Sequence, residues 1–192
     1  MDSEKLEYLR KCMKEVLSDS RYRHVIGVEE VCHDLALIYG VDVESACIAG
    51  ILHDCAKYMT GDDMIQECVE HGIEISKIER KLPHMLLHSK VGAVYAREKY
   101  GINDEDILNA IEFHTTGRPG MSKLERILFV ADYIEPNRKD SIPRLNEIRE
   151  TVYRDLDEGF IKILENKLAY LNQNEYLIDP RTEETYKYYV NK

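Results

Sequence analysis

Apolar residues recur every three or four positions along most of this chain, and that spacing constrains its fold more than any other feature. Val25, Val28 and Cys32 follow one face of a helix, because successive helical residues advance by about 100°. No segment alternates apolar and polar residues as a strand would. With only 10 Gly and 5 Pro, turn signals are sparse. We therefore expect an all-α fold of about seven or eight helices, in a single domain spanning residues 1–192.

Short polar side chains mark several of the expected helix boundaries. The candidate N-caps are Asp42, Asp62 or Asp63, and Ser122. Glu125 lies three residues after Ser122, which is the capping-box spacing. Gly72 and Gly101 suit the left-handed position just after a helix. His71 then lies at a helix C-terminus, where its positive charge interacts favourably with the helix dipole, so we interpret it as structural.

The formal net charge of −10 argues against a surface that binds nucleic acid, since that needs clustered Lys and Arg. A small phosphorylated ligand needs only a few cations in one pocket. The five cysteines lack Cys-x-x-Cys spacing and lie in helical segments, so we expect reduced core residues. The first residues lack the apolar stretch of a signal peptide, and no apolar run is long enough to span a bilayer. We expect a cytoplasmic protein without a membrane partner.

The dipeptide His53-Asp54 ends the apolar run at residues 47–52. An imidazole and a carboxylate therefore emerge where a central helix leaves the core. Burying both without partners would be costly, and a bound metal ion would offset that cost.

A second pair, His33-Asp34, serves as an internal comparison. Counted around the helix from His24, Val28 and Leu35 return to within about 40°, whereas His33 lies about 180° away. His24 therefore faces the core and is a candidate metal ligand. His33 is expected to face water.

His114 ends another helix with an apolar face, and Asp132 interrupts the apolar stretch at residues 127–131. Taken alone, Asp132 fits a hydrogen-bonded core acid better than a metal ligand. The groups that together make a mixed nitrogen and oxygen shell are His24, His53, Asp54 and Asp132. Such a shell suits iron, manganese or zinc and leaves positions open. A metal held there activates water and stabilises charge on phosphoryl oxygens.

Several basic side chains are candidates for phosphate contacts. Lys57 lies one turn after His53 and would point to the same side, although a solvated lysine at a helix end is the commoner case. His84 and His88 have the i, i+4 spacing of a two-ligand face. The arginines that flank the site in sequence are Arg21, Arg118 and Arg138. Guanidinium groups match phosphate, but each also fits an ordinary surface arginine.

The ordered set His24, His53-Asp54, Lys57, His88, His114 and Asp132 resembles the HD superfamily of metal-dependent phosphohydrolases. The narrower likeness is to the bacterial YqeK family, through Arg21-Tyr22-Arg23-His24, His53-Asp54-Cys-Ala-Lys57, His88-Ser-Lys-Val-Gly-Ala93, Phe113-His-Thr-Thr-Gly-Arg-Pro-Gly120 and Ala131-Asp-Tyr-Ile-Glu-Pro-Asn-Arg138. The likeness covers nearly the whole chain. It implies an HD-type helical bundle with a core at about 18–140 and C-terminal helices and a tail at about 141–192.

The resemblance implies symmetrical hydrolysis of diadenosine tetraphosphate (Ap4A) to two ADP by a metal-activated water, with iron as the metal and manganese or zinc as alternatives. The metal ligands it implies are His24, His53, Asp54 and Asp132. The catalytic residues it implies are Asp54, Lys57, His88 and His114. The substrate contacts it implies are Arg21, Asp54, Lys57, His88, His114, Tyr133, Arg138, Leu177, Ile178 and Pro180. It leaves His84 as a bystander and Arg118 without a clear role, and a homodimer is a hypothesis from the same likeness.

Two other functions remain open at this point. One is another HD phosphohydrolase, such as a nucleotidase or a cyclic-nucleotide phosphodiesterase, because the metal shell alone does not choose among phosphate esters and anhydrides. The other is a metal-holding domain that binds nucleotide without hydrolysing it. Nothing in the composition or spacing indicates adenine.

Overall fold

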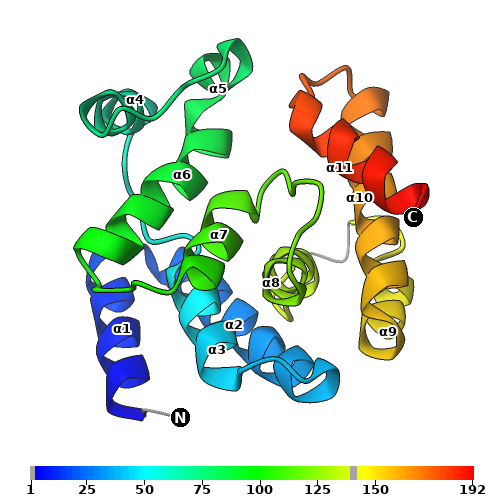
Figure 1. The fold of residues 1–192 in the computed structure, drawn as a ribbon, viewed down its shortest axis with the longest axis horizontal. Helices are drawn as coiled ribbons and strands as arrows, with labels where there is room; N and C mark the ends of the chain where they lie inside the picture. Colours follow the sequence, from blue (N-terminus) through cyan, green and yellow to red (C-terminus); the bar gives the residue numbers. More distant parts are fainter. Residues whose placement is uncertain (1–2, 139–141) are drawn as a thin grey trace.

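A computed structural model describes residues 3–138 and 142–192, which form eleven helices and no strand (Figure 1). The helices are α1 (Ser3–Val16), α2 (Asp19–Tyr39), α3 (Val43–Leu52), α4 (Gly61–Glu70), α5 (Lys77–Lys81), α6 (Pro83–Glu98), α7 (Glu105–Phe113), α8 (Lys123–Ile134), α9 (Leu145–Arg154), α10 (Leu156–Gln173) and α11 (Pro180–Val190). The all-α prediction is confirmed.

The predicted number of helices was too low because some boundaries carry no Gly or Pro. Asp155 alone separates α9 from α10, and Leu17 and Ser18 separate α1 from α2. Helix α5 has only 5 residues, too few to show a helical period. A count based on turn signals therefore merges or omits these helices.

Most predicted caps are confirmed. Asp42 accepts a hydrogen bond from the backbone N–H of Ser45 at the start of α3, and Ser122 forms a capping box with Glu125 at the start of α8. Gly72 and Gly101 have φ of +66° and +68°.

The predicted cap of α4 was wrong, because Thr60 takes this role in place of Asp62 or Asp63. The Thr60 hydroxyl accepts from the backbone N–H of Asp63, and the Asp63 carboxylate accepts from that of Thr60. Asp63 is therefore the reciprocal partner three residues into the helix.

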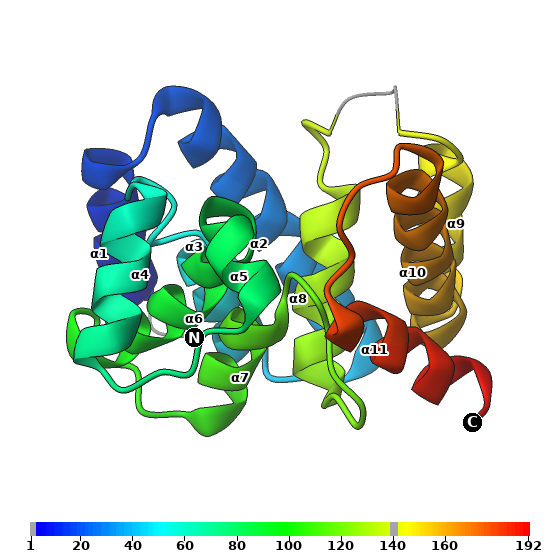
Figure 2. The ribbon, with the colours of Figure 1, turned by 90° about the horizontal axis from the view of Figure 1, so that it is seen from above.

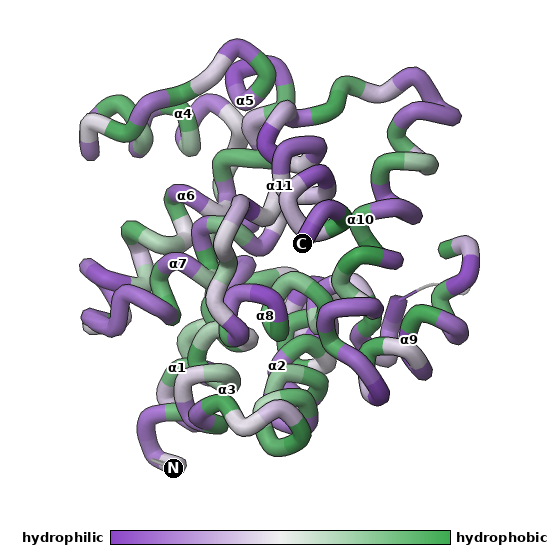
Figure 3. Tube along the Cα trace, turned by 45° about the vertical axis from the view of Figure 1, so that its right-hand side comes forward, coloured by the Kyte–Doolittle hydropathy of each residue, from purple (hydrophilic) through white to green (hydrophobic). Residues whose placement is uncertain are grey.

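Helix α3 lies at the centre of the fold, in contact with α1, α2, α7 and α8. Every residue from Ala46 to Leu52 is buried. Figure 3 shows hydrophobic residues concentrated in α2, α3 and α8. No helix of the described residues is long and apolar enough to cross a membrane.

Gly50 permits a close approach between α2 and α3. A Cβ atom at this position would lie 2.9 Å from the Cα of Glu29, closer than real Cβ atoms come to backbone. This contact brings His24 of α2 next to His53, the residue that ends α3.

The C-terminal helices pack against α8 on the side away from α1 and α4 (Figure 2). Phe160 of α10 is fully buried, and its ring meets those of Phe129 in α8 and Tyr189 in α11, with centroids 4.9 Å apart in both cases. Aromatic packing thus fixes α10 and α11 relative to α8. The five cysteines form no disulfide, and four of them are buried.

Candidate metal centre and adjoining cleft

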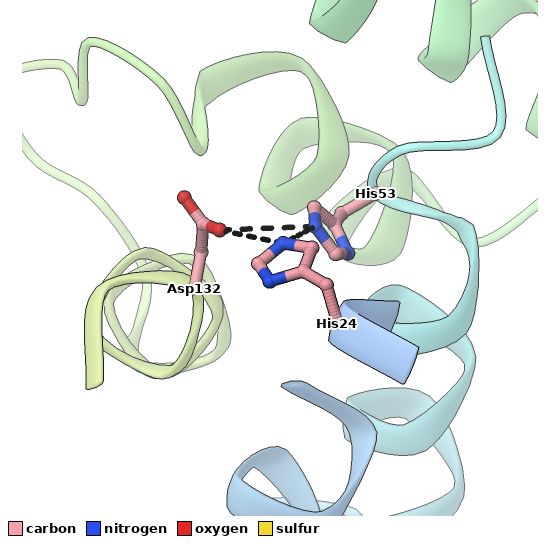
Figure 4. A group of neighbouring side chains, drawn as sticks. All are labelled: His24, His53 and Asp132. Atoms are coloured by element: carbon pink, nitrogen blue, oxygen red, sulfur yellow. Dashed lines mark hydrogen bonds and ion pairs between the residues drawn. The ribbon is translucent and has the colours of Figure 1, made fainter. Parts of the chain in front are cut away.

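Three predicted ligands meet where α2, α3 and α8 come together (Figure 4). The Nε2 atoms of His24 and His53 are 3.2 Å apart. Oδ1 of Asp132, in the last turn of α8, lies 3.1 Å from Nε2 of His24 and 3.9 Å from Nε2 of His53. One ion can therefore contact all three side chains.

Asp54 extends this cluster towards two further histidines. Its Oδ2 lies 3.5 Å from Nε2 of His53 and 3.7 Å from Nε2 of His24. Its Oδ1 lies 3.3 Å from Nε2 of His88 and 3.9 Å from Nε2 of His114. Asp54, His53 and His114 form a second group of close ligand atoms. The Asp54 carboxylate therefore bridges the two halves of the cluster.

The hydrogen bonds of the histidines test whether this cluster fits a metal. The Nδ1 partners are Gly50 O for His53 (2.7 Å), Ile111 O for His114 (2.7 Å) and Glu135 Oε1 for His24 (3.1 Å). Because these oxygens only accept, each Nδ1 carries the proton, and each neutral ring directs the Nε2 lone pair at the cluster. Lone pairs and carboxylates that face one another need a cation between them. The donor set therefore fits a metal ion.

His88 has a different hydrogen-bond arrangement. The ammonium of Lys57 lies 3.1 Å from its Nδ1, and an ammonium can only donate. Nδ1 of His88 is therefore the acceptor, and its Nε2 carries the proton, which is donated to Nε2 of His114 at 3.2 Å, with Oδ1 of Asp54 3.3 Å away. His88 thus donates a hydrogen bond to the centre, whereas His84 is exposed and only its carbonyl contacts Lys57.

Both carboxylates of the centre are held in the anionic form. Burial alone would raise the pKa of Asp54, but its interactions with His53, including a hydrogen bond, and with the nearby His88 and Lys57 hold that pKa well below its usual range. Burial would likewise raise the pKa of Asp132, but the Arg138 guanidinium, 2.6 Å away, and the His24 hydrogen bond hold it well below.

Burial has the opposite effect on the basic side chains. It lowers the pKa of His88 and of Lys57, and together with the neighbouring His53 it lowers the pKa of His114 to about 4. Burial would also lower the pKa of His24, but its hydrogen bonds with Asp132 and Glu135 outweigh burial and raise it.

In protein freed of metal with a chelator, we expect the free energy of unfolding to decrease as the pH falls from about 6.5 to about 4. In this window the unfolded chain binds protons at His88 and His114, and the folded chain does not, so stability rises with pH. Because the pKa of His24 is raised, this residue changes the free energy of unfolding with pH only above pH 6.5. Thermal midpoints measured across the window check this, and His114→Gln should flatten the curve. An equally steep curve in that variant would contradict the assignment.

The centre borders a cleft of about 260 Å³. The basic side chains that line this cleft are Arg21, Lys57, Arg138 and Lys167. Arg21 donates to Oδ2 of Asp54 at 2.8 Å, and Arg138 donates to the carbonyl and the carboxylate of Asp132. Four cationic side chains therefore gather in this cleft beside Asp54, Asp132 and Asp179, although the whole chain is acidic.

Apolar side chains line the cleft at two places. Leu82, Met85 and Leu86 come from the start of α6, and Leu171 and Leu177 come from α10 and the segment after it. Met85 is 61% exposed and Leu177 is 49% exposed. Both therefore offer apolar surface that the fold itself does not cover.

Three predicted substrate contacts are not among the residues that line the cleft. Tyr133 accepts a hydrogen bond from Asn166, whereas Ile178 and Pro180 are chain neighbours of the lining residues Leu177 and Asp179. Arg118 donates two hydrogen bonds of 2.7 Å to the buried carboxylate of Glu125. His33 is bonded to Asp34, and both side chains are largely exposed.

Sequence reasoning missed several residues of the site. These are Glu135, Leu82, Met85, Leu86, Thr115, Lys167, Leu171, Asp179 and Thr182. A signal existed for Glu135, because it lies three residues after Asp132 and can share a helix face with it. Met85 and Leu86 lie in the first turn of α6, three and two residues before His88. Lys167 belongs to no motif.

A larger cleft of about 500 Å³ lies at α1 and α2 and is lined by Arg10, Glu29 and His33 among others. Arg10 there neutralises the buried Glu29 through contacts of 2.5–3.1 Å. None of the close ligand groups in the described part of the chain lies there. Size alone therefore does not identify the functional cleft.

The sequence matches the family model of the HD domain over residues 21–137. Two relatives named "Bis(5'-nucleosyl)-tetraphosphatase, symmetrical" are similar over most of their length. The protein from Halalkalibacterium halodurans is 42% identical, covering 91% of both chains, and that from Bacillus subtilis is 37% identical, covering 94% of this chain and 95% of the relative.

A solved structure from Clostridium acetobutylicum has a similar fold, with a TM-score of 0.91 and 37% identity over 96% of both chains. It is described as a "predicted HD superfamily hydrolase involved in NAD metabolism". The similarity extends through the C-terminal helices, beyond the residues that the family model matches.

Proposed function

The chain belongs to the HD domain family and to its symmetrical bis(5'-nucleosyl)-tetraphosphatases, and we propose from this that it hydrolyses Ap4A to two molecules of ADP. The observation that carries the proposal is the position of a metal-fitting cluster at the side of a cationic cleft. A hydrolase of polyphosphates needs both features together, because the substrate is highly anionic.

The residues proposed to hold the metal are His24, His53, Asp54 and Asp132. A divalent or trivalent transition metal bound there supplies Lewis acidity, which activates water and stabilises phosphoryl charge. We propose iron from the family likeness, with manganese or zinc as alternatives. The Nδ1 hydrogen bonds described above orient the imidazoles for this role.

The protein's own donors act on the phosphates. His88 presents an Nε2 proton and Lys57 an ammonium on the same side of Asp54, so both can neutralise the departing ADP. Two bonds from Arg138 to Asp132 use two of its five N–H donors, which leaves the others for phosphate oxygens. Arg21 and His114 complete the proposed phosphate contacts.

The two apolar linings of the cleft suit a substrate with a nucleoside at each end. Figure 1 shows the start of α6 and the α10–α11 connection on opposite sides of the α7–α8 loop. A tetraphosphate whose central bridge lies at the cluster would extend towards both. We propose Leu177, with Ile178 and Pro180 nearby, for one base, and Met85 and Leu86 for the other.

The net charge of −10 supports a small-molecule ligand in preference to nucleic acid. We retain a cytoplasmic location and a homodimer as proposals from the family likeness. Light scattering at working concentration tests the homodimer, which is wrong if the measured mass is that of one chain.

Product analysis tests the proposed reaction. Iron-loaded protein incubated with Ap4A should yield ADP alone on anion-exchange chromatography. AMP with ATP would mean attack at an outer phosphorus and would overturn symmetrical cleavage. NAD is the second substrate to test, because the solved relative is described in connection with NAD metabolism. Bound but intact Ap4A after long incubation would favour a binding domain.

A further inference from the structure

Lys167 of α10 lines the cleft from outside the matched HD segment, which ends at residue 137. Its Nζ donates a hydrogen bond to the carbonyl of Thr115, the residue after His114. The ammonium also lies 5.4 Å from the ring centroid of Phe129. These contacts place a positive charge beside the centre, although the residue belongs to the C-terminal helices.

The surroundings of Lys167 differ from those of Lys90 and Lys162. Lys90 is buried, and its ammonium is 2.7 Å from the carboxylate of Glu79. Lys162, on the same helix as Lys167, pairs with Glu147 and Glu158. Within the part of the chain that is described, Lys167 has no carboxylate at ion-pair distance.

A desolvated ammonium without a carboxylate is costly, and its environment indicates what would offset the cost. Burial lowers the pKa of Lys167. Asp132, the acid of the centre, is already bonded to Arg138 and His24. Arg138 and Lys167 therefore form a pair of cations in one cleft, and that pair favours an anion with several oxygens.

We propose that Lys167 binds a phosphate group of the substrate, so that the C-terminal helices supply part of the active site. This inference rests on the proposed hydrolysis of a dinucleoside polyphosphate. The bond to Thr115 holds the ammonium beside the centre, and phosphate oxygens would supply the direct anionic contact that no described carboxylate makes.

The test replaces Lys167 with Met, which keeps the apolar stem, and uses Lys162→Met as the matched control on the same helix. A charged hydrogen bond of this kind corresponds to about a tenfold effect or more. We expect the KM for Ap4A to rise at least about tenfold for Lys167→Met, with a smaller change in kcat, and Lys162→Met to match the unsubstituted protein. Lys167→Arg should restore most of the affinity.

Thermal unfolding distinguishes phosphate binding from a purely structural role, in which Lys167 would only connect α10 to the α7–α8 loop. Loss of a desolvated charge should leave the thermal midpoint of ligand-free Lys167→Met unchanged or higher. A clear decrease in that midpoint, or a KM within twofold of the unsubstituted protein, would overturn the inference while leaving the proposed function intact.

Calorimetry with ADP and adenosine gives an independent answer if the unsubstituted protein fails to hydrolyse Ap4A. Lys167→Met should then weaken ADP binding about tenfold relative to Lys162→Met and leave adenosine binding unchanged. Equal weakening of both ligands, or of neither, would overturn the phosphate contact.

Discussion

Asp54→Asn should reduce Ap4A hydrolysis at least about a thousandfold and lower the metal content of the purified protein. Asp54 offers one oxygen to His24 and His53 and the other to His88 and His114, so its carboxylate joins both halves of the centre. An amide removes the negative charge that a cation needs. Lewis-acid stabilisation is worth several kcal/mol, and each 1.36 kcal/mol corresponds to about a tenfold change in rate.

Asp34→Asn is the matched control, because Asp34 also directly follows a histidine but has a side chain that is 56% exposed. It should retain activity and metal content. Metal analysis and product chromatography on both variants measure the contrast. Full activity in Asp54→Asn with unchanged metal content would place the reaction at another site.

Phe160→Ala should destabilise the protein by about 3–5 kcal/mol, because a buried phenyl ring leaves a cavity that the surroundings fill only in part. The ring lies between Phe129 and Tyr189 and so connects α10 with both α8 and α11. Such a loss is a large fraction of the usual 5–15 kcal/mol. The chain has no tryptophan, so urea unfolding followed by helical circular dichroism is the suitable measurement.

Tyr170→Ala is the control for aromatic loss on the same helix, since Tyr170 is 51% exposed and its ring meets only the exposed Tyr176. It should cost no more than about 1 kcal/mol. A similarly small effect for Phe160→Ala would mean that the C-terminal helices do not unfold together with the core. The position of Lys167 would then depend on local contacts alone.

Local periodicity was enough to predict the side chains that leave the core at helix ends. The angular argument separated His24, which joins the centre, from His33, which is bonded only to its neighbour. The placement of His53 and His114 at the ends of α3 and α7 is confirmed. These residues lie within or next to strongly apolar segments, so the direction in which each side chain points follows from the spacing of apolar residues in the sequence.

Residues that reach the site through tertiary contacts could not be predicted in this way. Lys167 is one of two lysines in α10, and its place in the cleft follows only from the packing of α10 against α8. Met85 resembles a buried helical residue in sequence, yet it is exposed in the cleft. The break between α9 and α10 depends on the cap formed by Asp155, which accepts from two backbone N–H groups.

The hydrogen bonds from His53 to Gly50 O and from His114 to Ile111 O have a consequence for how such a centre can diverge. Both acceptors are carbonyls in the last turn of a helix, which lack partners inside the helix. Each histidine therefore bonds a free carbonyl at a helix end, and this bond orients its ring through a backbone atom that no substitution can remove. If Met85, Leu86 and Leu177 contact the nucleosides as proposed, substitutions there change the nucleoside preference without misaligning the imidazoles. Evolution can alter what this scaffold hydrolyses while it inherits the means of hydrolysis unchanged.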